Sequence, residues 1–257
     1  MSRSGAELLV ERRGPTLVMT LNRPEVRNAV NASLAEALAC ALADLDADEA
    51  LRVGILTGRG ASFCSGLDLK AFLAGEPRSV EGRGFAGLTE APPAKPLIAA
   101  VEGAAMAGGF EMVLACDLVV AGDGASFGLP EVRRGLIAGS GGLIRLPHRI
   151  PPQIAMEYAL TGDMMSAAEA HRWGLVNRLA PTGEALGTAQ ALAARIAGNA
   201  PLSIAFSKEL ITGAATWTEA EAWDRQRQRL DTVIASADAR EGAEAFVQKR
   251  PAVWSGE

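Results

Sequence analysis

Apolar and polar positions in the first half of the chain form short runs that are typical of β-strands. Residues 7–11 and 17–21 flank a turn at residues 13–15, and this arrangement predicts a hairpin. Three later runs are apolar throughout and bounded by turns, at residues 53–57, 98–101 and 118–121. Uniformly apolar runs indicate strands that are buried on both faces. A helical pattern at residues 110–115 separates the last two runs, so we expect parallel strands joined by right-handed crossovers.

Helical spacing of apolar positions occupies residues 34–45, where residues 31–33 supply N-cap candidates. Beyond Pro147 the pattern is helical almost throughout. The segments that carry it are residues 151–160, 166–173, 184–197, 202–212, 218–235 and 239–247. A joint with glycine and proline falls at residues 198–201. We therefore expect an α/β core at residues 1–198 and a helical C-terminal region at residues 199–257.

The composition indicates a soluble globular protein, because 49% of the 257 residues are hydrophobic and 21% are charged. A net charge of −5 argues against nucleic-acid binding, which requires a cationic surface. The most apolar stretch, residues 104–122, contains Glu111 and Asp117, so we expect no membrane span. Residues 1–13 lack the apolar segment of a secretion signal, and we expect a cytoplasmic protein.

The cysteines and histidines are sparse. Cys40, Cys64 and Cys116 form no CxxC pair and have no histidine at metal-ligand spacing, so we expect reduced, buried thiols and no metal site. His148 and His171 have no nucleophilic partner that the sequence places beside them, and packing roles are expected for both.

Two glutamates follow glycine-rich turns. Glu111 ends the run Gly-Gly-Phe-Glu, and Glu131 ends the run Gly-Leu-Pro-Glu. Two nearby carboxylates can exchange protons with a carbonyl-containing substrate. The glycine-rich loops at residues 58–70 and 103–109 each follow a predicted strand, so their backbone amides can form an oxyanion hole. The nucleotide-binding patterns GxGxxG and GxxxxGK[ST] are absent, which disfavours a phosphate cradle.

These blocks closely resemble the crotonase (enoyl-CoA hydratase) superfamily. The similarity lies in residues 21–29, 54–58, 63–70, 108–111, 127–131, 135–147, 174–177 and 246–251. It spans nearly the whole chain. The resemblance implies an α/β fold with a crotonase-like spiral of ββα turns. It also implies that the helical C-terminal region assembles homotrimers or homohexamers.

The resemblance further implies an acyl-CoA thioester as substrate, with no cofactor besides the coenzyme A that the substrate carries. The backbone amides of Leu67 and Gly108 would bind the thioester oxygen, while Glu111 activates water and Glu131 exchanges a proton at Cα. The positions that correspond to substrate or CoA contacts are Arg27, Ala29, Ser65, Gly66, Asp68, Leu69, Lys70, Phe246 and Lys249. Asp68 has a second interpretation as the cap of the next helix. Residues 71–95 are expected to be mobile and to line the acyl pocket.

The leading hypothesis is an enoyl-CoA hydratase. An isomerase of the same superfamily needs one carboxylate and would leave Glu111 idle, whereas a dehydratase of the carnitinyl-CoA type would use both glutamates in reverse. A thioester hydrolase would release a free thiol. A non-catalytic CoA-ester-binding subunit would be expected to have lost a glutamate or the Gly108-Gly109 turn, and both are present. The acyl group, the trimer or hexamer state and the division of proton transfer between the glutamates stay open.

Overall fold

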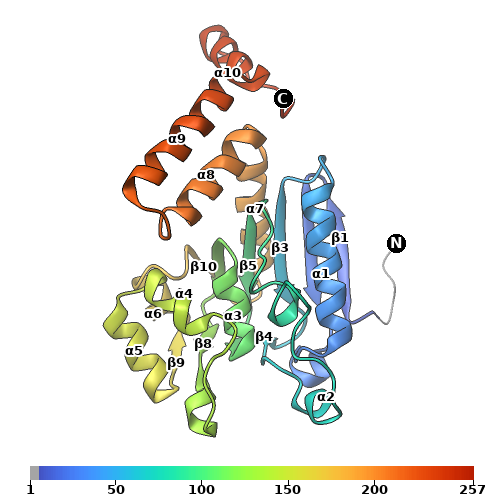
Figure 1. Ribbon diagram of the computed structural model, residues 1–257. Helices are drawn as coiled ribbons and strands as arrows, with labels where there is room; N and C mark the ends of the chain where they lie inside the picture. The colour runs from blue at the N-terminus through green and yellow to red at the C-terminus, as the bar shows by residue number, and fades with distance from the viewer. Residues whose placement is uncertain (1–5) are drawn as a thin grey trace.

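The computed structural model describes residues 6–257, so residues 1–5 of the expected core lie outside the described part (Figure 1). A six-stranded sheet runs in the order β1-β2-β3-β5-β7-β10. Its strands are β1 (Leu8–Arg13), β2 (Thr16–Leu21), β3 (Val53–Gly58), β5 (Leu97–Val101), β7 (Leu118–Gly122) and β10 (Arg178–Ala180). Strands β1 and β2 form the expected antiparallel hairpin, and the other neighbours are parallel.

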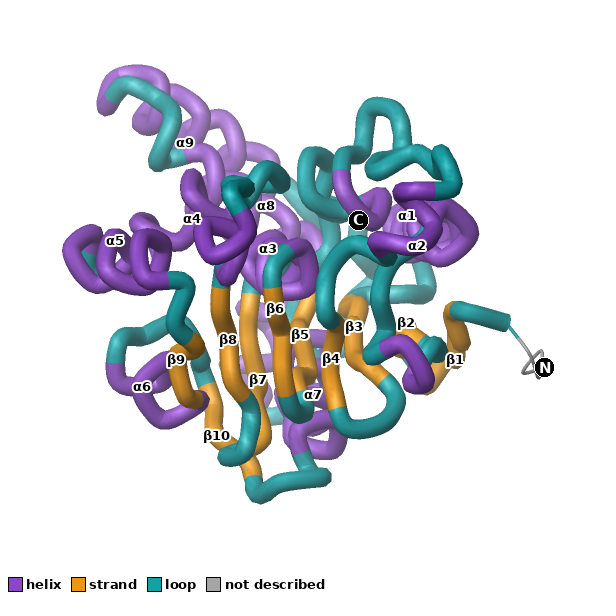
Figure 2. The backbone as a smooth tube through the Cα atoms, turned by 90° about the horizontal axis from the view of Figure 1, so that it is seen from below, coloured by secondary structure: helices purple, strands orange, loops and turns teal. Residues whose placement is uncertain are grey.

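A second sheet runs in the order β4-β6-β8-β9, and Figure 2 shows its strands side by side. They are β4 (Ser62–Cys64), β6 (Ala104–Met106), β8 (Ser126–Gly128) and β9 (Met164–Ser166). Each of β3, β5 and β7 is followed by one strand of this second sheet. Helices α2 (Leu69–Leu73) and α3 (Gly108–Ala115) then complete the first two turns. This repetition confirms the α/β fold class with a ββα spiral.

The expected parallel pairing of β5 and β7, with a helix between them, is confirmed, but before α3 the connection also forms β6 of the second sheet. Three-residue strands are too short to show a period-2 pattern, so no local pattern of apolar positions marks them. Each pairs with a neighbour that is distant in sequence.

Helices α1 (Ala32–Ala47), α3 and α7 (Ala185–Ala197) cover the two faces of the larger sheet. The other helices of the described chain are α4 (Gly142–Arg149), α5 (Pro152–Thr161), α6 (Ala167–Arg172), α8 (Pro201–Gly213), α9 (Glu219–Ile234) and α10 (Ala237–Gln248). Ala189 and Ala193 of α7 pack on Ile55 and Ile98 of one face. The opposite face packs against α1 and α3. The predicted joint falls between α7 and α8, and α8, α9 and α10 extend away from the sheets (Figure 1).

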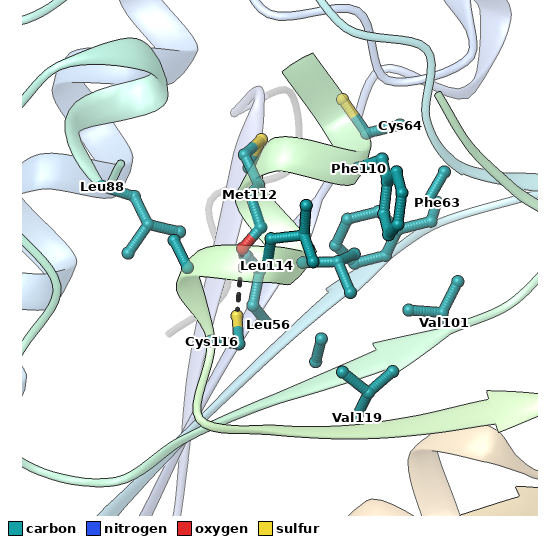
Figure 3. Packing of buried hydrophobic residues seen from close by; sticks show 14 of the residues in the cluster. Leu56, Phe63, Cys64, Leu88, Val101, Phe110, Met112, Leu114, Cys116 and Val119 are labelled. Atoms are coloured by element: carbon teal, nitrogen blue, oxygen red, sulfur yellow. Dashed lines mark hydrogen bonds between the residues drawn. The ribbon is translucent and has the colours of Figure 1, made fainter. Parts of the chain in front are cut away.

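Helix α3 lies entirely within the core. Figure 3 shows Phe110, Met112 and Leu114 among side chains of the surrounding strands. Cys116 follows the helix and donates through Sγ to the carbonyl of Met112 at 3.3 Å. Cys64 and Cys116 are buried as expected, but the prediction is wrong for Cys40, which lies on the exposed side of α1. Because α3 is packed on all sides, the position of its N-terminus is fixed.

Asn28 connects the turn after β2 to β4. Its side chain is fully buried, and Nδ2 donates to the carbonyls of Arg59, Ser62 and Phe63 at 3.0, 2.8 and 3.1 Å. Its Oδ1 accepts from the Arg23 amide at 2.9 Å. The backbone φ is 55°, a left-handed conformation that asparagine tolerates better than most residues. Asn28 thus positions the loop beyond β4.

We expect Asn28→Ala to lower the free energy of unfolding by about 3 kcal/mol or more, since several buried carbonyls lose their donor. Denaturant unfolding at one fixed protein concentration measures this change. Asn28→Asp retains the shape but places a carboxylate oxygen against the same carbonyls, so we expect at least as large a loss. A loss below about 1 kcal/mol in both variants would contradict this role.

Candidate active site

The loop after β4 pairs with the segment after the first 3₁₀ turn, η1 (Pro24–Val26). The amide of Ser65 donates to the Arg27 carbonyl at 3.0 Å. The Val30 amide donates to the Gly66 carbonyl at 2.8 Å, and the Asp68 amide donates to the Val30 carbonyl at 2.9 Å. Successive groups in extended backbone point to opposite sides, so the Leu67 amide points away from Val30. Among residues 6–257, the Leu67 N–H has no hydrogen-bond acceptor.

The N-terminus of α3 lies directly against this loop. A Cβ added to Gly66 would lie 3.1 Å from the Gly108 nitrogen and 3.0 Å from the Ala107 Cβ, and Gly66 has a φ of 93°. Ala107 has φ 51° and ψ −130°, an unfavourable conformation for alanine, and donates to the Gly128 carbonyl at 2.9 Å. Gly108 is the first helical residue, and its N–H has no acceptor in the described chain. The structure therefore brings the free amides of Leu67 and Gly108 into one small region.

Glu111 lies one turn into α3, and its side chain is buried with 2% exposure. Its Oε1 accepts from the amides of Ser140 and Gly142, at 2.6 and 2.9 Å. Ser140 lies just before α4, and Gly142 is its first residue. The carboxylate therefore lies at the N-terminus of this helix, where the helix dipole is positive. Oε2 has no hydrogen bond to any residue in 6–257. One oxygen of Glu111 is fixed while the other is free to accept a proton.

Glu131 lies at the start of the 3₁₀ segment η3 (Pro130–Arg134), with Pro130 before it. Its Oε2 is buried and has no hydrogen-bond partner within the described residues. Burial raises the pKa of Glu131, and the negative charge of Glu111 raises it further, while its own backbone amide and Arg134 oppose the shift. The two carboxylates are therefore close enough to interact, and Glu131 favours the protonated form more than an exposed glutamate does.

This raised pKa predicts a pH-dependent stability. A carboxyl whose pKa is higher in the folded state binds more protons when folded, so its contribution to stability is lost as the pH rises from about 4.5 through the folded pKa. Glu131→Gln retains the shape without titrating. We expect the Tm of Glu131→Gln minus that of the wild type to increase with pH over this range. Calorimetry between about pH 4 and pH 8 measures it, and a constant difference would contradict the assignment.

Asp68 caps α2. Its Oδ1 accepts from the amides of Lys70 and Ala71 at 3.1 and 3.3 Å, and its Oδ2 pairs with Arg23 at 3.0 Å. Burial opposes ionisation, but these hydrogen bonds and the charge of Arg23 lower the pKa of Asp68 overall. The capping interpretation is confirmed. The Arg23–Asp68 pair also fixes the backbone next to Leu67.

The remaining predicted contact residues fall into two groups. Arg27, Ala29, Ser65 and Gly66 belong to the paired segments, and Leu69 and Lys70 follow on α2 with exposed side chains. Phe246 and Lys249 lie at the end of α10, where Phe246 is 84% exposed. Figure 1 shows α10 and α2 at opposite ends of the molecule. The structure therefore does not bring Phe246 and Lys249 to the Arg27–Lys70 region of the same chain.

Several groups that hold the candidate site in place were not predicted from the sequence. The Ser140 and Gly142 amides hold Glu111, and Phe85 packs on Gly108, whose added Cβ would lie 2.5 Å from the ring. The glycines of residues 71–95 predicted a mobile segment. That expectation is wrong for residues 85–89, which are buried between α1 and α3. Only the glycine-rich run at residues 139–142 hinted at a turn before α4.

Within residues 6–257, no three His, Cys, Asp or Glu side chains are grouped to hold a metal ion. In the same range, every helix is too short or too polar to cross a membrane.

The two-sheet ββα spiral is the fold of crotonase-type enzymes. The family model for enoyl-CoA hydratase/isomerase matches residues 11–257. The chain therefore belongs to the enoyl-CoA hydratase/isomerase family, and the expectation of an enzyme is confirmed.

Individual proteins similar to this chain also belong to the enoyl-CoA hydratase/isomerase class. The structure of an enoyl-CoA hydratase from Mycobacterium marinum is 56% identical, with a TM-score of 0.96 over 98% of this chain and 100% of that one. A carnitinyl-CoA dehydratase from Salmonella enteritidis is 43% identical over 97% of this chain and 98% of its own. The structure of a carnitinyl-CoA hydratase from Mycobacterium avium is 42% identical, with a TM-score of 0.80 over 99% and 100%. These relatives support the hydro-lyase class.

Proposed function

We propose that this protein is an enoyl-CoA hydratase, which adds water reversibly and syn to a trans-2-enoyl-CoA and gives a 3-hydroxyacyl-CoA. The observation that carries the proposal is the unequal environment of the two glutamates. Glu111 has one oxygen held by the Ser140 and Gly142 amides, while Glu131 has a buried oxygen without a partner and a raised pKa. Two carboxylates in such different environments can act on one substrate as a general base, Glu111, and a general acid, Glu131.

In the proposed reaction, the Leu67 and Gly108 amides donate to the thioester oxygen. Glu111 accepts a proton from water as the water oxygen bonds to Cβ, and the alkene electrons move onto the thioester oxygen. Protonated Glu131 then donates its proton to Cα as the enolate collapses. Each amide donor is worth about 3 kcal/mol in the transition state. The chemistry requires no cofactor besides the coenzyme A of the substrate.

We further propose that the coenzyme A contacts come from more than one chain. Arg27, Ala29 and residues 65–70 would contribute from one subunit, and Phe246 and Lys249 from another. The distance between α2 and α10 in Figure 1 supports this division, as does the exposed apolar surface at Ile211 and Phe246, which are 77% and 84% exposed. A homotrimer or homohexamer would place these surfaces together. The free thiols Cys40, Cys64 and Cys116 support a reducing, cytoplasmic location.

Dehydration of a carnitinyl-CoA-type substrate is the second candidate, since a relative of that name is 43% identical along nearly the whole chain. Dehydration is the reverse reaction, so the two glutamates would exchange their acid and base roles. An isomerase needs only one carboxylate, and Glu111 would then have no catalytic role.

A panel of thioesters separates these functions. We expect loss of the conjugated-alkene absorbance of crotonyl-CoA and of a longer 2-enoyl-CoA, with water incorporated. Turnover confined to a 3-hydroxyacyl-CoA with a quaternary ammonium group would favour the second candidate. Conversion of a 3-enoyl-CoA to a 2-enoyl-CoA alone would favour an isomerase. Release of free thiol would indicate a thioesterase, and binding without any turnover would indicate a non-catalytic subunit.

A further inference from the structure

Arg145 connects the two halves of the candidate active site. It lies in the first turns of α4, and its Nη2 donates to the Thr89 carbonyl at 2.5 Å. The guanidinium also folds back over Gly141, where an added Cβ would overlap Nη1. Gly141 has a φ of 99°, a backbone conformation that favours glycine, and a Cβ at this position would displace the end of the Arg145 side chain.

The first end of this connection is the turn that supports Gly108. Thr89 is 1% exposed, and its Oγ1 accepts from the Phe85 amide at 2.9 Å. The Thr89 amide donates back to the Phe85 carbonyl at 3.2 Å. The Phe85 ring lies directly on Gly108, whose added Cβ would be 2.5 and 2.6 Å from two ring carbons. A shift of Thr89 would therefore move the surface on which the first residue of α3 rests.

The second end is the loop that holds Glu111. Gly141, under the guanidinium, directly precedes Gly142, whose amide donates to Glu111 Oε1 at 2.9 Å. Without Arg145, no side chain of α4 would hydrogen bond to the turn at residues 85–89 within the described chain. Glu111 and Gly108 share α3, but the loop and the turn that fix them come from distant parts of the sequence.

We propose that Arg145 is a positioning residue, which sets the Glu111 carboxylate relative to the Gly108 amide by joining the α4 loop to the Phe85–Thr89 turn. The inference rests on the proposed function, since it assigns the carboxylate and the amide to the same substrate. Arg145 acts through these groups and does not contact the reacting atoms. A displacement of about 1 Å in such a constellation costs on the order of 100-fold in rate.

The test compares Arg145→Met and Arg145→Lys with the wild type. We expect Arg145→Met to lower kcat about 10- to 100-fold while the KM for the 2-enoyl-CoA changes little, because the CoA contacts lie elsewhere. Arg145→Lys retains one donor to Thr89 and should recover part of kcat. Thr89→Val removes the acceptor of the Phe85 amide. We expect the double variant Thr89→Val/Arg145→Met to lose less kcat than the product of the two single losses, because both substitutions break the same connection.

Arg149→Met is the matched control. Arg149 is on the same helix and donates to the carbonyls of Cys116 and Asp117 at 2.6 and 3.1 Å, at the other end of α3. We expect it to lower Tm with kcat near that of the wild type. Equal losses of kcat in Arg145→Met and Arg149→Met would indicate only general docking of α4 and would overturn the inference. A wild-type kcat in Arg145→Met would also overturn it.

A binding measurement separates this inference from the proposed function. Hydrogen bonding to the carbonyl of a conjugated enoyl thioester polarises it and shifts its absorption to longer wavelength. We expect a smaller shift in Arg145→Met than in the wild type and in Arg149→Met, at saturating thioester. If the wild type binds the thioester without hydrating it, the proposed function fails, while this shift still decides the inference. An unchanged shift in Arg145→Met contradicts it.

Discussion

Glu111→Gln should lower kcat for hydration of a 2-enoyl-CoA about 1,000-fold, because a positioned proton-transfer group contributes about 100- to 10,000-fold. The glutamine carbonyl can still accept from the Ser140 and Gly142 amides, so the side chain should stay in place. The NH₂ group that replaces the second oxygen cannot accept a proton from water. Binding of the CoA thioester should therefore be retained, and steady-state absorbance assays together with calorimetric titration measure both quantities.

Glu102→Gln is a matched control for this substitution. Glu102 Oε1 also accepts from two amides at the start of a helix, those of Gly183 and Ala185, at 3.0 and 2.9 Å. It lies beside α7, away from the candidate site. We expect the kcat of Glu102→Gln to match that of the wild type. Glu131→Gln should resemble Glu111→Gln, and the double variant should lose little more, since both carboxylates act in one reaction. Less than a tenfold loss in Glu111→Gln would exclude it as the base.

Gly66→Ala is the second substitution with a large expected effect. The new Cβ would lie 3.1 Å from the Gly108 nitrogen and 3.0 Å from the Ala107 Cβ, so it would crowd the proposed oxyanion donor at Gly108 and shift it relative to the Leu67 amide. Loss of one oxyanion donor costs about 100- to 1,000-fold in kcat, and we expect a loss of at least about 100-fold. The assay that follows the conjugated alkene measures it, with Tm recorded alongside.

Gly174→Ala is the control for the backbone strain that Gly66→Ala introduces. Gly174 has a φ of 88°, close to the 93° of Gly66, and an added Cβ there meets no atom within 4 Å. Gly174→Ala should therefore incur only the conformational penalty, about 1–2 kcal/mol of stability, with kcat unchanged. If both alanine variants lose kcat equally, strain and not crowding of the Gly108 amide is responsible.

The longer elements could be predicted from the sequence. Strand β3 and helices α1 and α7 are long enough for their apolar spacing to identify them, and Asn31 caps α1 as the sequence indicated. The strands of the second sheet could not be located from local patterns, because strands such as β6 contain three residues and exist only through pairing with distant segments, and only the family resemblance implied a second strand in each turn. Helix α4 was missed because Pro147 lies inside it.

The candidate site shows the same limit. Glycine turns before Glu111 and Glu131 were visible in the sequence, and the family resemblance suggested the amides of Leu67 and Gly108. The groups that hold them were not visible. Arg145 and Thr89 are 56 residues apart, and Phe85 reaches Gly108 only after residues 85–89 pack against α1. Tertiary contacts between ordinary side chains leave no local pattern in a single sequence.

Hydration of crotonyl-CoA in heavy water shows whether Glu111 and Glu131 together add water across the double bond. We expect a 3-hydroxybutyryl-CoA with one deuterium at Cα on the same face as the hydroxyl at Cβ, because Glu111 would direct water to Cβ and deuterated Glu131 would donate to Cα from the same side of the substrate. Nuclear magnetic resonance of the product gives the position and the relative configuration of that deuterium. A product with the double bond moved and no hydroxyl, or an anti arrangement of hydroxyl and deuterium, would contradict syn hydration by the two glutamates.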